Sequence, residues 1–505
     1  MPNVTERFRD NVALRPDAIA LRSPDHTMSY RDLDCRSAAF AAALRQLGVA
    51  AGDRVVLVAP TVPEFAIAFL GTQLIGAITV PVNTMATAPE IGHILDDSGA
   101  MVAIAWHATR ESAEQAVEQR GRTLVILEAD AFAGIHGERI EPADRLIDDT
   151  AVLLYTSGTT GKPKGVELTV ANLVETARIF IEQLRMGPDE RMGTGLPLFH
   201  VFGLAVGLVT ALHSGASFSL LTPFEPRAMI EMIRDHRLTM VSGVPTMWNA
   251  MLHTAIDIGP ADFTHLRLAA SGGASLPAQV IQAFSERFGC TILEGYGLTE
   301  SSGAATYNPL GREQRVGSVG SALPGTSIEI RDLRGELVPQ GVAGELYVRG
   351  PSVMKGYWNS DDATASELVD GWLKTGDLAC CDADGYVYIV GRAKDLIIRG
   401  GYNVYPREVE EVLYQHPDIV EVAVIGLPDE RYGEEVGAAV VTAPGSTLNA
   451  VSLRAWAKQR LSAYKVPHLF AFVDELPKGP TGKILTSGFA GLRFVTAVPE
   501  SERTA

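Results

Sequence analysis

The sequence predicts an α/β protein with a large N-terminal domain of parallel sheets wrapped by helices, followed by a small α+β domain. Three observations lead to this fold class. Apolar runs of strand length alternate with helical patterns up to about residue 325, which is the rhythm of βαβ units. From about residue 344 short strands dominate instead. The chain of 505 residues is also longer than one hydrophobic core usually supports.

The first region supplies its elements in order. A helix is expected from residue 29 to residue 47 and another over residues 63–75, where apolar residues recur at helical spacing. The expected strands are short apolar runs at residues 55–59, 76–82, 101–105, 123–127, 151–154, near 241, 266–270 and 291–293. Strands that alternate with helices in this way predict a parallel sheet.

The second region begins after a boundary between residues 391 and 392, so the expected domains are 1–391 and 392–505. Around and beyond this boundary we expect strands at residues 345–348, 386–390, 396–398, 420–425, 436–442 and 469–473. Helices are expected over residues 406–414, with proline in the first turn, and over residues 453–461. The tail after Arg493 is polar and is expected to be loose.

Composition and charge limit the classes of function. The chain is 46% hydrophobic and 20% charged, which is ordinary for a globular enzyme. A net charge of −17 argues against nucleic acid and anionic membranes as main partners. The longest apolar run, residues 201–212, is too short to span a bilayer, and the N-terminus lacks the apolar core of a signal peptide. The cysteines have no metal-ligand spacing and are expected to be free thiols in the cytoplasm: Cys35, Cys290, Cys380 and Cys381.

A glycine-rich loop follows the strand at residues 151–154. Glycines allow backbone N–H groups to turn toward an anion, while hydroxyls add donors and lysines add charge. The loop therefore predicts a polyphosphate site. It is not the P-loop of ATPases, because only two residues separate its first two glycines and a proline stands where a hydroxyl is needed. The loop reads Tyr155, Thr156, Ser157, Gly158, Thr159, Thr160, Gly161, Lys162, Pro163, Lys164, Gly165.

Two further segments directly follow expected parallel strands, at the sheet edge where open α/β proteins bind ligands. In the second of them, Tyr296 offers a ring for stacking and Thr299 a hydroxyl for phosphate. Glu300 offers the hard oxygen ligand that Mg²⁺ prefers. The two segments read Ser271, Gly272, Gly273, Ala274 and Glu294, Gly295, Tyr296, Gly297, Leu298, Thr299, Glu300.

Several single residues have two interpretations on sequence alone. His200 is either a satisfied core histidine, which is favoured, or a pocket residue. Asp377 is a plain turn aspartate or a ligand for the two hydroxyls of a ribose. Lys483 lies in a proline- and glycine-rich loop, where a solvated surface lysine is the ordinary interpretation. Arg392 and Lys394 straddle the domain boundary.

Taken together and in this order, these motifs resemble the adenylate-forming (ANL) superfamily of acyl-CoA synthetases, adenylation domains and luciferases, and its fatty acyl-CoA synthetase type in particular. The resemblance covers nearly the whole chain. Each motif alone is weak, but their ordered set is specific: residues 155–165, Pro-Leu-Phe-His at 197–200, residues 295–300, Thr-Gly-Asp at 375–377, Gly-Arg-Ala-Lys-Asp at 391–395 and Pro-Thr-Gly-Lys at 480–483.

The resemblance implies a ligase that joins ATP and a carboxylic acid into an acyl-adenylate, which a thiol such as CoA then attacks. It implies that Lys483 bridges the carboxylate and the α-phosphate, that Thr299 holds the α-phosphate, and that Glu300 holds Mg²⁺. His200 is predicted to be a catalytic residue as well. The small domain would be mobile and rotate about Lys394, and Asn403 would face the site only in the thioester-forming pose. The implied nucleotide-binding set is Thr156, Ser157, Gly158, Thr159, Thr160, Gly161, Lys164, Gly272, Gly273, Ala274, Gly295, Tyr296, Gly297, Asp377, Arg392 and Asn403.

The acid is expected to be apolar. His200 stands where amino-acid-activating relatives have aspartate, and residues 243–250 lack the cation that would pair the second carboxylate of malonate. Phe202 and Trp248 are expected to add apolar side chains to the wall of the acyl pocket. Each CH₂ of a substrate chain buried in such a pocket stabilises binding by about 0.8 kcal/mol. A medium- or long-chain fatty acid is therefore predicted. The second candidate is an aryl acid whose ring would pack between Phe202 and Trp248.

Other functions remain open at this point. The thiol could belong to a carrier protein, and a luciferase-type oxidoreductase shares the first half-reaction. A non-catalytic nucleotide-binding relative is disfavoured because Lys483 and Glu300 are both present. The expected partners are thus ATP, an acid and CoA, without nucleic acid or an integral membrane segment, and the sequence leaves open whether the protein is a homodimer.

Overall fold

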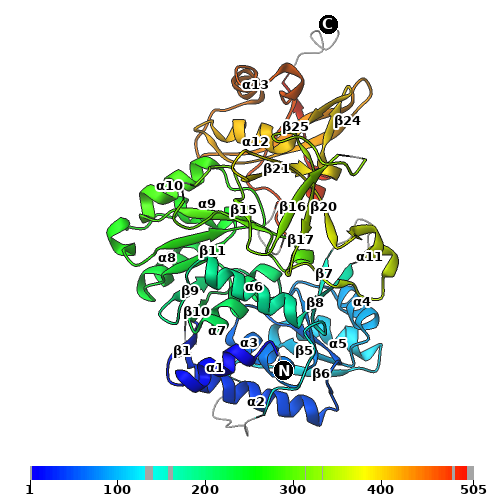
Figure 1. Ribbon diagram of the computed structural model, residues 1–505. Helices are drawn as coiled ribbons and strands as arrows, with labels where there is room; N and C mark the ends of the chain where they lie inside the picture. The colour runs from blue at the N-terminus through cyan, green and yellow to red at the C-terminus, as the bar shows by residue number, and fades with distance from the viewer. Residues whose placement is uncertain are drawn as a thin grey trace.

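Four sheets organise the part of the chain that the computed structural model describes, residues 3–24, 26–130, 140–156, 163–312, 314–332, 334–479 and 484–497. Three sheets and their helices form the large N-terminal part. The fourth belongs to a C-terminal unit, which lies at the opposite end of the molecule from the N-terminus (Figure 1). The predicted fold class is confirmed.

The central strands of the first sheet run parallel to one another, and the strands at its two edges are antiparallel. Its order is β15(Ser321–Ala322), β14(Thr306–Tyr307), β13(Ile292–Tyr296), β12(Leu268–Ser271), β11(Met240–Gly243), β9(Arg191–Thr194), β10(Ser217–Leu220), β1(Ile19–Arg22), β2(Thr27–Ser29). One face packs on α8(Pro226–Asp235), α9(Pro245–His253) and α10(Ala278–Phe288). The other packs on α1(Glu6–Leu14), α6(Val170–Gln183), the π-helix η2(Phe202–Val209) and α7(Thr210–Ser214).

The second sheet carries the predicted phosphate loop between β7 and β8, which pair as an antiparallel hairpin. Its order is β18(Gly356–Tyr357), β8(Lys164–Thr169), β7(Thr150–Thr156), β4(Ile78–Val82), β3(Arg54–Val58), β5(Val102–Trp106), β6(Thr123–Leu127). One face packs on α4(Ala88–Ser98) and α5(Arg110–Glu118). The other packs on α2(Tyr30–Gln46) and α3(Pro63–Leu74). Every residue of α3 is buried, because most of this helix is apolar and its polar side chains, Glu64, Thr72 and Gln73, have hydrogen-bond partners.

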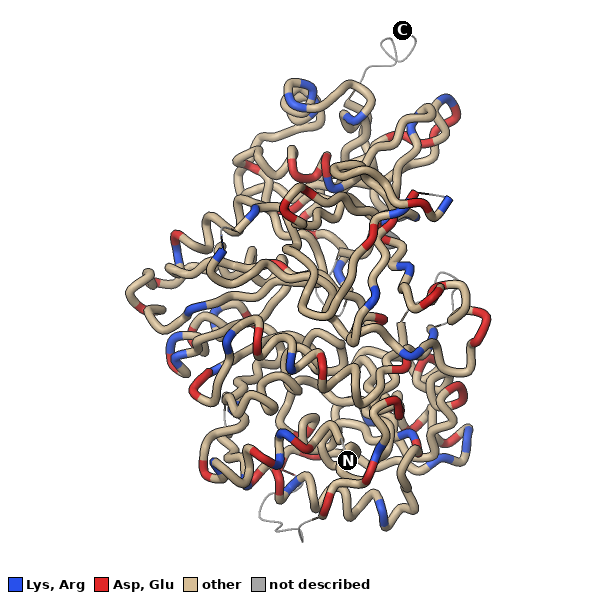
Figure 2. The backbone as a smooth tube through the Cα atoms, in the orientation of Figure 1, with Lys and Arg blue, Asp and Glu red and all other residues tan. Residues whose placement is uncertain are grey.

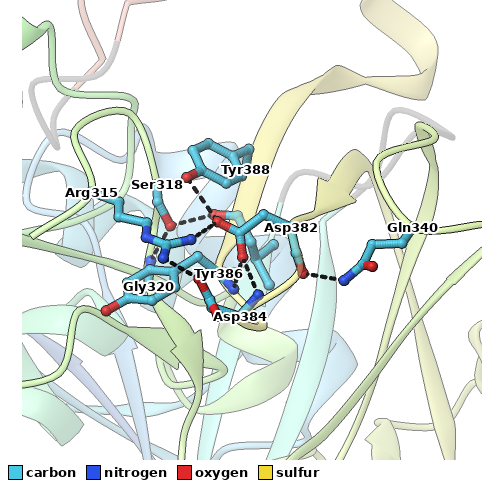
Figure 3. A network of polar contacts seen from close by, with 9 residues as sticks. Arg315, Ser318, Gly320, Gln340, Asp382, Asp384, Tyr386 and Tyr388 are labelled. Atoms are coloured by element: carbon cyan, nitrogen blue, oxygen red, sulfur yellow. Dashed lines mark hydrogen bonds and ion pairs between the residues drawn. The ribbon is translucent and has the colours of Figure 1, made fainter.

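The third sheet is antiparallel and leads into the C-terminal unit. It contains β16(Ser327–Arg331), β17(Gly344–Arg349), β20(Trp372–Cys381), β19(Leu368–Val369) and β21(Val387–Arg392), with α11(Asp361–Glu367) before β19. The turn between β20 and β21 is held by Asp382, which accepts hydrogen bonds from Asp384 N, Tyr386 N and Tyr388 Oη, while Arg315 binds both aspartates (Figure 3). This network fixes the far end of the hairpin that carries Asp377 and Arg392.

The C-terminal unit has its own sheet and core. Its strands are β23(Tyr402–Val404), β22(Ile397–Arg399), β25(Gly433–Thr442), β26(Leu469–Phe472), β27(Val495–Thr496) and β24(Ile419–Asp429), with α12(Pro406–Tyr414) and α13(Ala450–Lys458). The tail was expected to be loose after Arg493. That expectation is wrong for Val495 and Thr496, which pair with Phe470 and Leu469 and so satisfy an otherwise open sheet edge.

No helix in the described ranges is both long and apolar enough to cross a bilayer. Lysine and arginine are interspersed with aspartate and glutamate along the chain in the view of Figure 2. The cysteines Cys35, Cys290, Cys380 and Cys381 are unpaired thiols, as expected.

Candidate active site

A cavity of about 1430 Å³ opens at the carboxyl ends of the strands of the first sheet and extends to the C-terminal unit. It brings together residues that are far apart in the sequence. Those predicted as site residues and found in its wall are Thr156, Lys164, His200, Phe202, Gly272, Gly273, Ala274, Gly295, Gly297, Thr299, Glu300, Arg392 and Lys394. Other predicted residues lie outside the described part of the chain: Ser157, Gly158, Thr159, Thr160, Gly161 and Lys483.

The ends of the predicted phosphate loop face each other in the wall, since Thr156 and Lys164 are register partners on β7 and β8. The Lys164 ammonium lies 5.2 Å from the centre of the Tyr357 ring, a cation–π contact that orients it. Tyr357 is on β18, which pairs with β8. The loop therefore presents a positive charge toward the cavity.

Glu300 contacts the same tyrosine as this lysine and lies on the short 3₁₀ helix η4(Thr299–Ser301). Its Oε1 accepts hydrogen bonds from Tyr357 Oη at 3.1 Å and from Thr156 Oγ1 at 3.5 Å. Burial and the nearby Glu300 charge raise the pKa of Tyr357, so its hydroxyl remains a donor at neutral pH. Tyr357 lies outside every sequence motif, so no local pattern indicates its place in this site. The carboxylate thus links the phosphate loop to the segment after β13.

Asp377 is almost fully buried, with 3% of its surface exposed, and both of its carboxylate oxygens have partners. Tyr296 Oη donates to Oδ2 at 2.5 Å, and Arg392 Nε lies 3.0 Å from Oδ1. Arg392 reaches this position because it is the register partner of Asp377 on β21. Burial and the Asp377 charge raise the pKa of Tyr296 well above its usual value. Three predicted nucleotide-binding residues therefore form one cluster.

Two glycines in the wall are closely packed, and at Gly297 there is no room for a side chain. A Cβ on Gly272 would lie 3.3 Å from the Phe202 ring, so this ring covers the backbone after β12. A Cβ on Gly297 would lie 2.2 Å from the backbone of Gly303, where the chain after β13 folds back on itself. His200 also lines the cavity, and its Nδ1 accepts the Phe202 amide at 3.3 Å. The pocket interpretation of His200, which the sequence disfavoured, is the one observed.

Trp248 does not line the cavity, contrary to the expectation that it would form acyl-pocket wall. It is fully buried on α9, with its ring 5.4 Å from that of Phe284 on α10. A Cβ on Gly243 would lie 2.8 Å from the indole, which shows that the ring packs beneath β11. It thus lies on the face of the first sheet opposite the cavity, because α9 covers that face.

The cavity continues into an apolar part that sequence motifs did not reveal. We call it the inner slot and define it by the lining residues Phe180, Leu184, Met186, Met192, Val206, Thr210, Met240, Ala270 and Tyr307. Phe202, Val206 and Thr210 follow one another at intervals of four along η2 and α7 and share one face.

The C-terminal unit closes the other side of the cavity. Ile484 and Leu485, the residues that follow Lys483, line it. Arg407 of α12 donates to the carbonyl oxygens of Ile389 and Gly317 at 2.6 and 3.1 Å, which joins this unit to the N-terminal part. Asn403 is exposed on the β22–β23 hairpin and is not in the wall. The two residues that follow Lys483 therefore line the cavity, whereas the predicted site residue Asn403 does not.

Comparisons with known proteins agree with this arrangement. Residues 8–358 match the model of the AMP-binding enzyme family, and residues 408–483 match the AMP-binding enzyme C-terminal domain. The chain is 38% identical over 479 residues to a feruloyl-CoA synthase from Amycolatopsis, with 94% of this chain and 95% of the relative covered. It is also 38% identical over 518 residues to a long-chain-fatty-acid–CoA ligase from Yersinia pestis, covering 94% and 92%.

Among solved structures, the ATP-bound MatB of Rhodopseudomonas palustris superposes with a TM-score of 0.91 at 33% identity, covering 97% of this chain and 98% of that one. Family models, sequence relatives and structure therefore agree from one end of the chain to the other. The protein belongs to the AMP-binding enzymes of the adenylate-forming (ANL) superfamily and is an ATP-dependent acid–thiol ligase of the acyl- or aryl-CoA synthetase kind.

Proposed function

We propose that this ligase activates an aryl monocarboxylic acid as its acyl-adenylate and transfers the acyl group to CoA. The observation that carries the proposal is the inner slot, whose wall combines the rings of Phe180 and Tyr307 with the thioethers of Met186, Met192 and Met240. Flat rings are favoured beside aromatic faces and thioether sulfurs. The charged residues that line the cavity lie on other segments.

ATP would occupy the wider part of the cavity. Lys164 and Thr156, together with the loop between them, would hold the β- and γ-phosphates, and Thr299 the α-phosphate. Gly272, Gly273 and the Tyr296 segment would hold adenine, while Asp377 and Arg392 would hold the ribose. Two pairs of side chains in this region are already in contact: Thr156 with Glu300, and Tyr296 with Asp377. Their closeness supports one continuous nucleotide site.

Glu300 would bind Mg²⁺. A single carboxylate fits this role, because Mg²⁺ in nucleotide sites is held by one or two carboxylates together with the substrate phosphates. The Glu300 carboxylate lies beside Thr156 at the start of the phosphate loop, so its donor atoms are hard oxygens next to the expected phosphates. When bound, the ion neutralises charge on the phosphates.

In the first step a carboxylate oxygen of the acid would attack the α-phosphorus, the bond to the β-phosphate oxygen would break, and pyrophosphate would leave. Lys483 would hold the two anions together and stabilise the charge on phosphorus. In the second step the sulfur of CoA would attack the acyl carbon, AMP would leave, and the thiol proton would pass to solvent. Residues 392–505 would rotate about Lys394 between these steps and bring Asn403 to the site.

The relatives support an acid–CoA reaction but differ in their acids. One is named for feruloyl-CoA and another for long-chain fatty acids, at the same identity of 38%. The fatty acid predicted from the sequence is therefore the second candidate, supported by the Yersinia ligase. Both names contain CoA, which supports CoA over a carrier-protein thiol or a luciferase-type oxidation.

The acid is tested by measuring kcat/KM for thioester formation with acetate, malonate, benzoate, cinnamate, octanoate and palmitate. We expect cinnamate to rank first. Acetate and malonate should fall below it by about a hundredfold, because acetate buries several fewer carbons and malonate would bury an unpaired charge. A first rank for octanoate or palmitate would replace the proposal by the second candidate. A first rank for malonate would contradict both.

A further inference from the structure

The inner slot has a defined depth. Met240 and Ser242 alternate along β11 and both line the cavity, so they share the face of the first sheet that looks toward α6 and η2. Met192 pairs with Met240, and Ala270 pairs with Ser242, so the same wall continues on β9 and β12. The cavity thus runs from the carboxyl edge of the sheet to its amino edge, roughly 10 Å for three residue steps along a strand.

Tyr307 lies in the wall of this slot. It is 4% exposed, and its ring meets that of Phe180 edge to face, with 5.7 Å between the centroids. Its hydroxyl has no hydrogen-bond partner among the residues that the structure describes. A buried hydroxyl without a partner is costly, and apart from Thr210, whose hydroxyl donates to the Ala205 carbonyl at 3.0 Å, the other side chains that line the slot are apolar and offer no strong acceptor or donor.

The surroundings of Tyr307 also indicate how deep its hydroxyl lies. Burial raises the pKa of Tyr307, against the opposing influence of Arg267 and with a smaller contribution from Cys290. Arg267 directly precedes β12 and Cys290 lies just before β13, so both mark the amino edge of the sheet. The hydroxyl is therefore protonated at neutral pH and able both to donate and to accept, and the two groups that act on it belong to the amino edge of the sheet, far from the phosphate loop.

We propose that Tyr307 is a specificity-determining residue whose hydroxyl hydrogen-bonds a phenolic hydroxyl at the far end of the acid, so that the substrate is a para-hydroxylated aryl acid of the cinnamate type. This rests on the proposed function and narrows its substrate class. A saturated alkyl tail in the slot leaves the Tyr307 hydroxyl unpaired. A distal carboxylate would find no cation among the residues that line the slot, because Arg267 lies behind this wall, where it pairs with Glu190 at 2.7 Å and contacts Met240 Sδ at 3.3 Å.

The first test uses the unmodified protein. We expect kcat/KM for 4-hydroxycinnamate to exceed that for cinnamate by roughly ten- to a hundredfold, since a site built to bond a hydroxyl discriminates against the analogue that lacks it. Octanoate and 8-hydroxyoctanoate form a second pair, which separates recognition of the hydroxyl from recognition of the ring. Equal values for the two cinnamates, or a preference for cinnamate, would overturn the proposal. If these acids give thioester without that preference, the proposed function stands and this inference fails; if none reacts, both fail.

The second test is Tyr307→Phe, which removes only the hydroxyl. The ratio of kcat/KM between 4-hydroxycinnamate and cinnamate should fall to about one, while the value for cinnamate is kept or rises. Tyr30→Phe is the matched control, because Tyr30 is also buried but donates to the Ala216 carbonyl at 2.8 Å. It should lower the Tm and leave the ratio unchanged, whereas Tyr307→Phe should not lower the Tm. A ratio that survives Tyr307→Phe would contradict the inference.

Discussion

Replacing Lys483 with alanine is expected to lower acid-dependent pyrophosphate exchange by about a thousandfold, while conversion of supplied acyl-adenylate and CoA to thioester continues. The reason is electrostatic. The carboxylate and the triphosphate repel each other, and a lysine placed between them stabilises the charge that develops on phosphorus. Thioester formation starts from a neutral acyl carbon and does not need that cation. Ile484 and Leu485 in the cavity wall support this position for the segment.

The control for this variant is Lys458→Ala. Lys458 is an exposed lysine in the last turn of α13, in the same C-terminal unit but outside the cavity wall. Its loss should leave both half-reactions near their original rates. If Lys483→Ala lowers both half-reactions to the same degree while the protein remains folded, the proposed role of Lys483 in adenylation alone is wrong.

Lys394→Pro is expected to slow thioester formation on the order of a hundredfold, with pyrophosphate exchange retained, because proline fixes the backbone angle φ about which a hinge must turn. Lys394 is exposed and lies in the short 3₁₀ segment η5(Ala393–Asp395), between β21 of the third sheet and β22 of the C-terminal sheet. Single-turnover measurement of each half-reaction separates the two effects. Unchanged rates for both would exclude rotation about this residue.

Local patterns predicted the elements of this fold well. The apolar run at residues 123–127 coincides with β6, and the helix with proline in its first turn coincides with α12 at Pro406–Tyr414. The motif residues were also predicted to lie together because they follow parallel strands, and the carboxyl ends of such strands share one edge. This is why Gly272, Glu300 and Thr299 were found in one wall.

The inner slot could not be predicted in the same way. Met192 and Met240 meet because β9 and β11 are register partners, although 48 positions separate them, and no local pattern encodes such a pairing. Trp248 illustrates the opposite error. Its neighbours Thr246 and Asn249 line the cavity, but α9 turns the indole into the core on the other face of the sheet. Which face a helix covers is decided by packing over long distances in sequence.

The most direct test of the two-step ligase is the balance of products. The protein is incubated with ATP, Mg²⁺, CoA and 4-hydroxycinnamate, and AMP, pyrophosphate and thioester are quantified together. We expect equal amounts of all three, with none of them formed when the acid is omitted. Formation of ADP and phosphate, or nucleotide cleavage that does not depend on the acid, would contradict it.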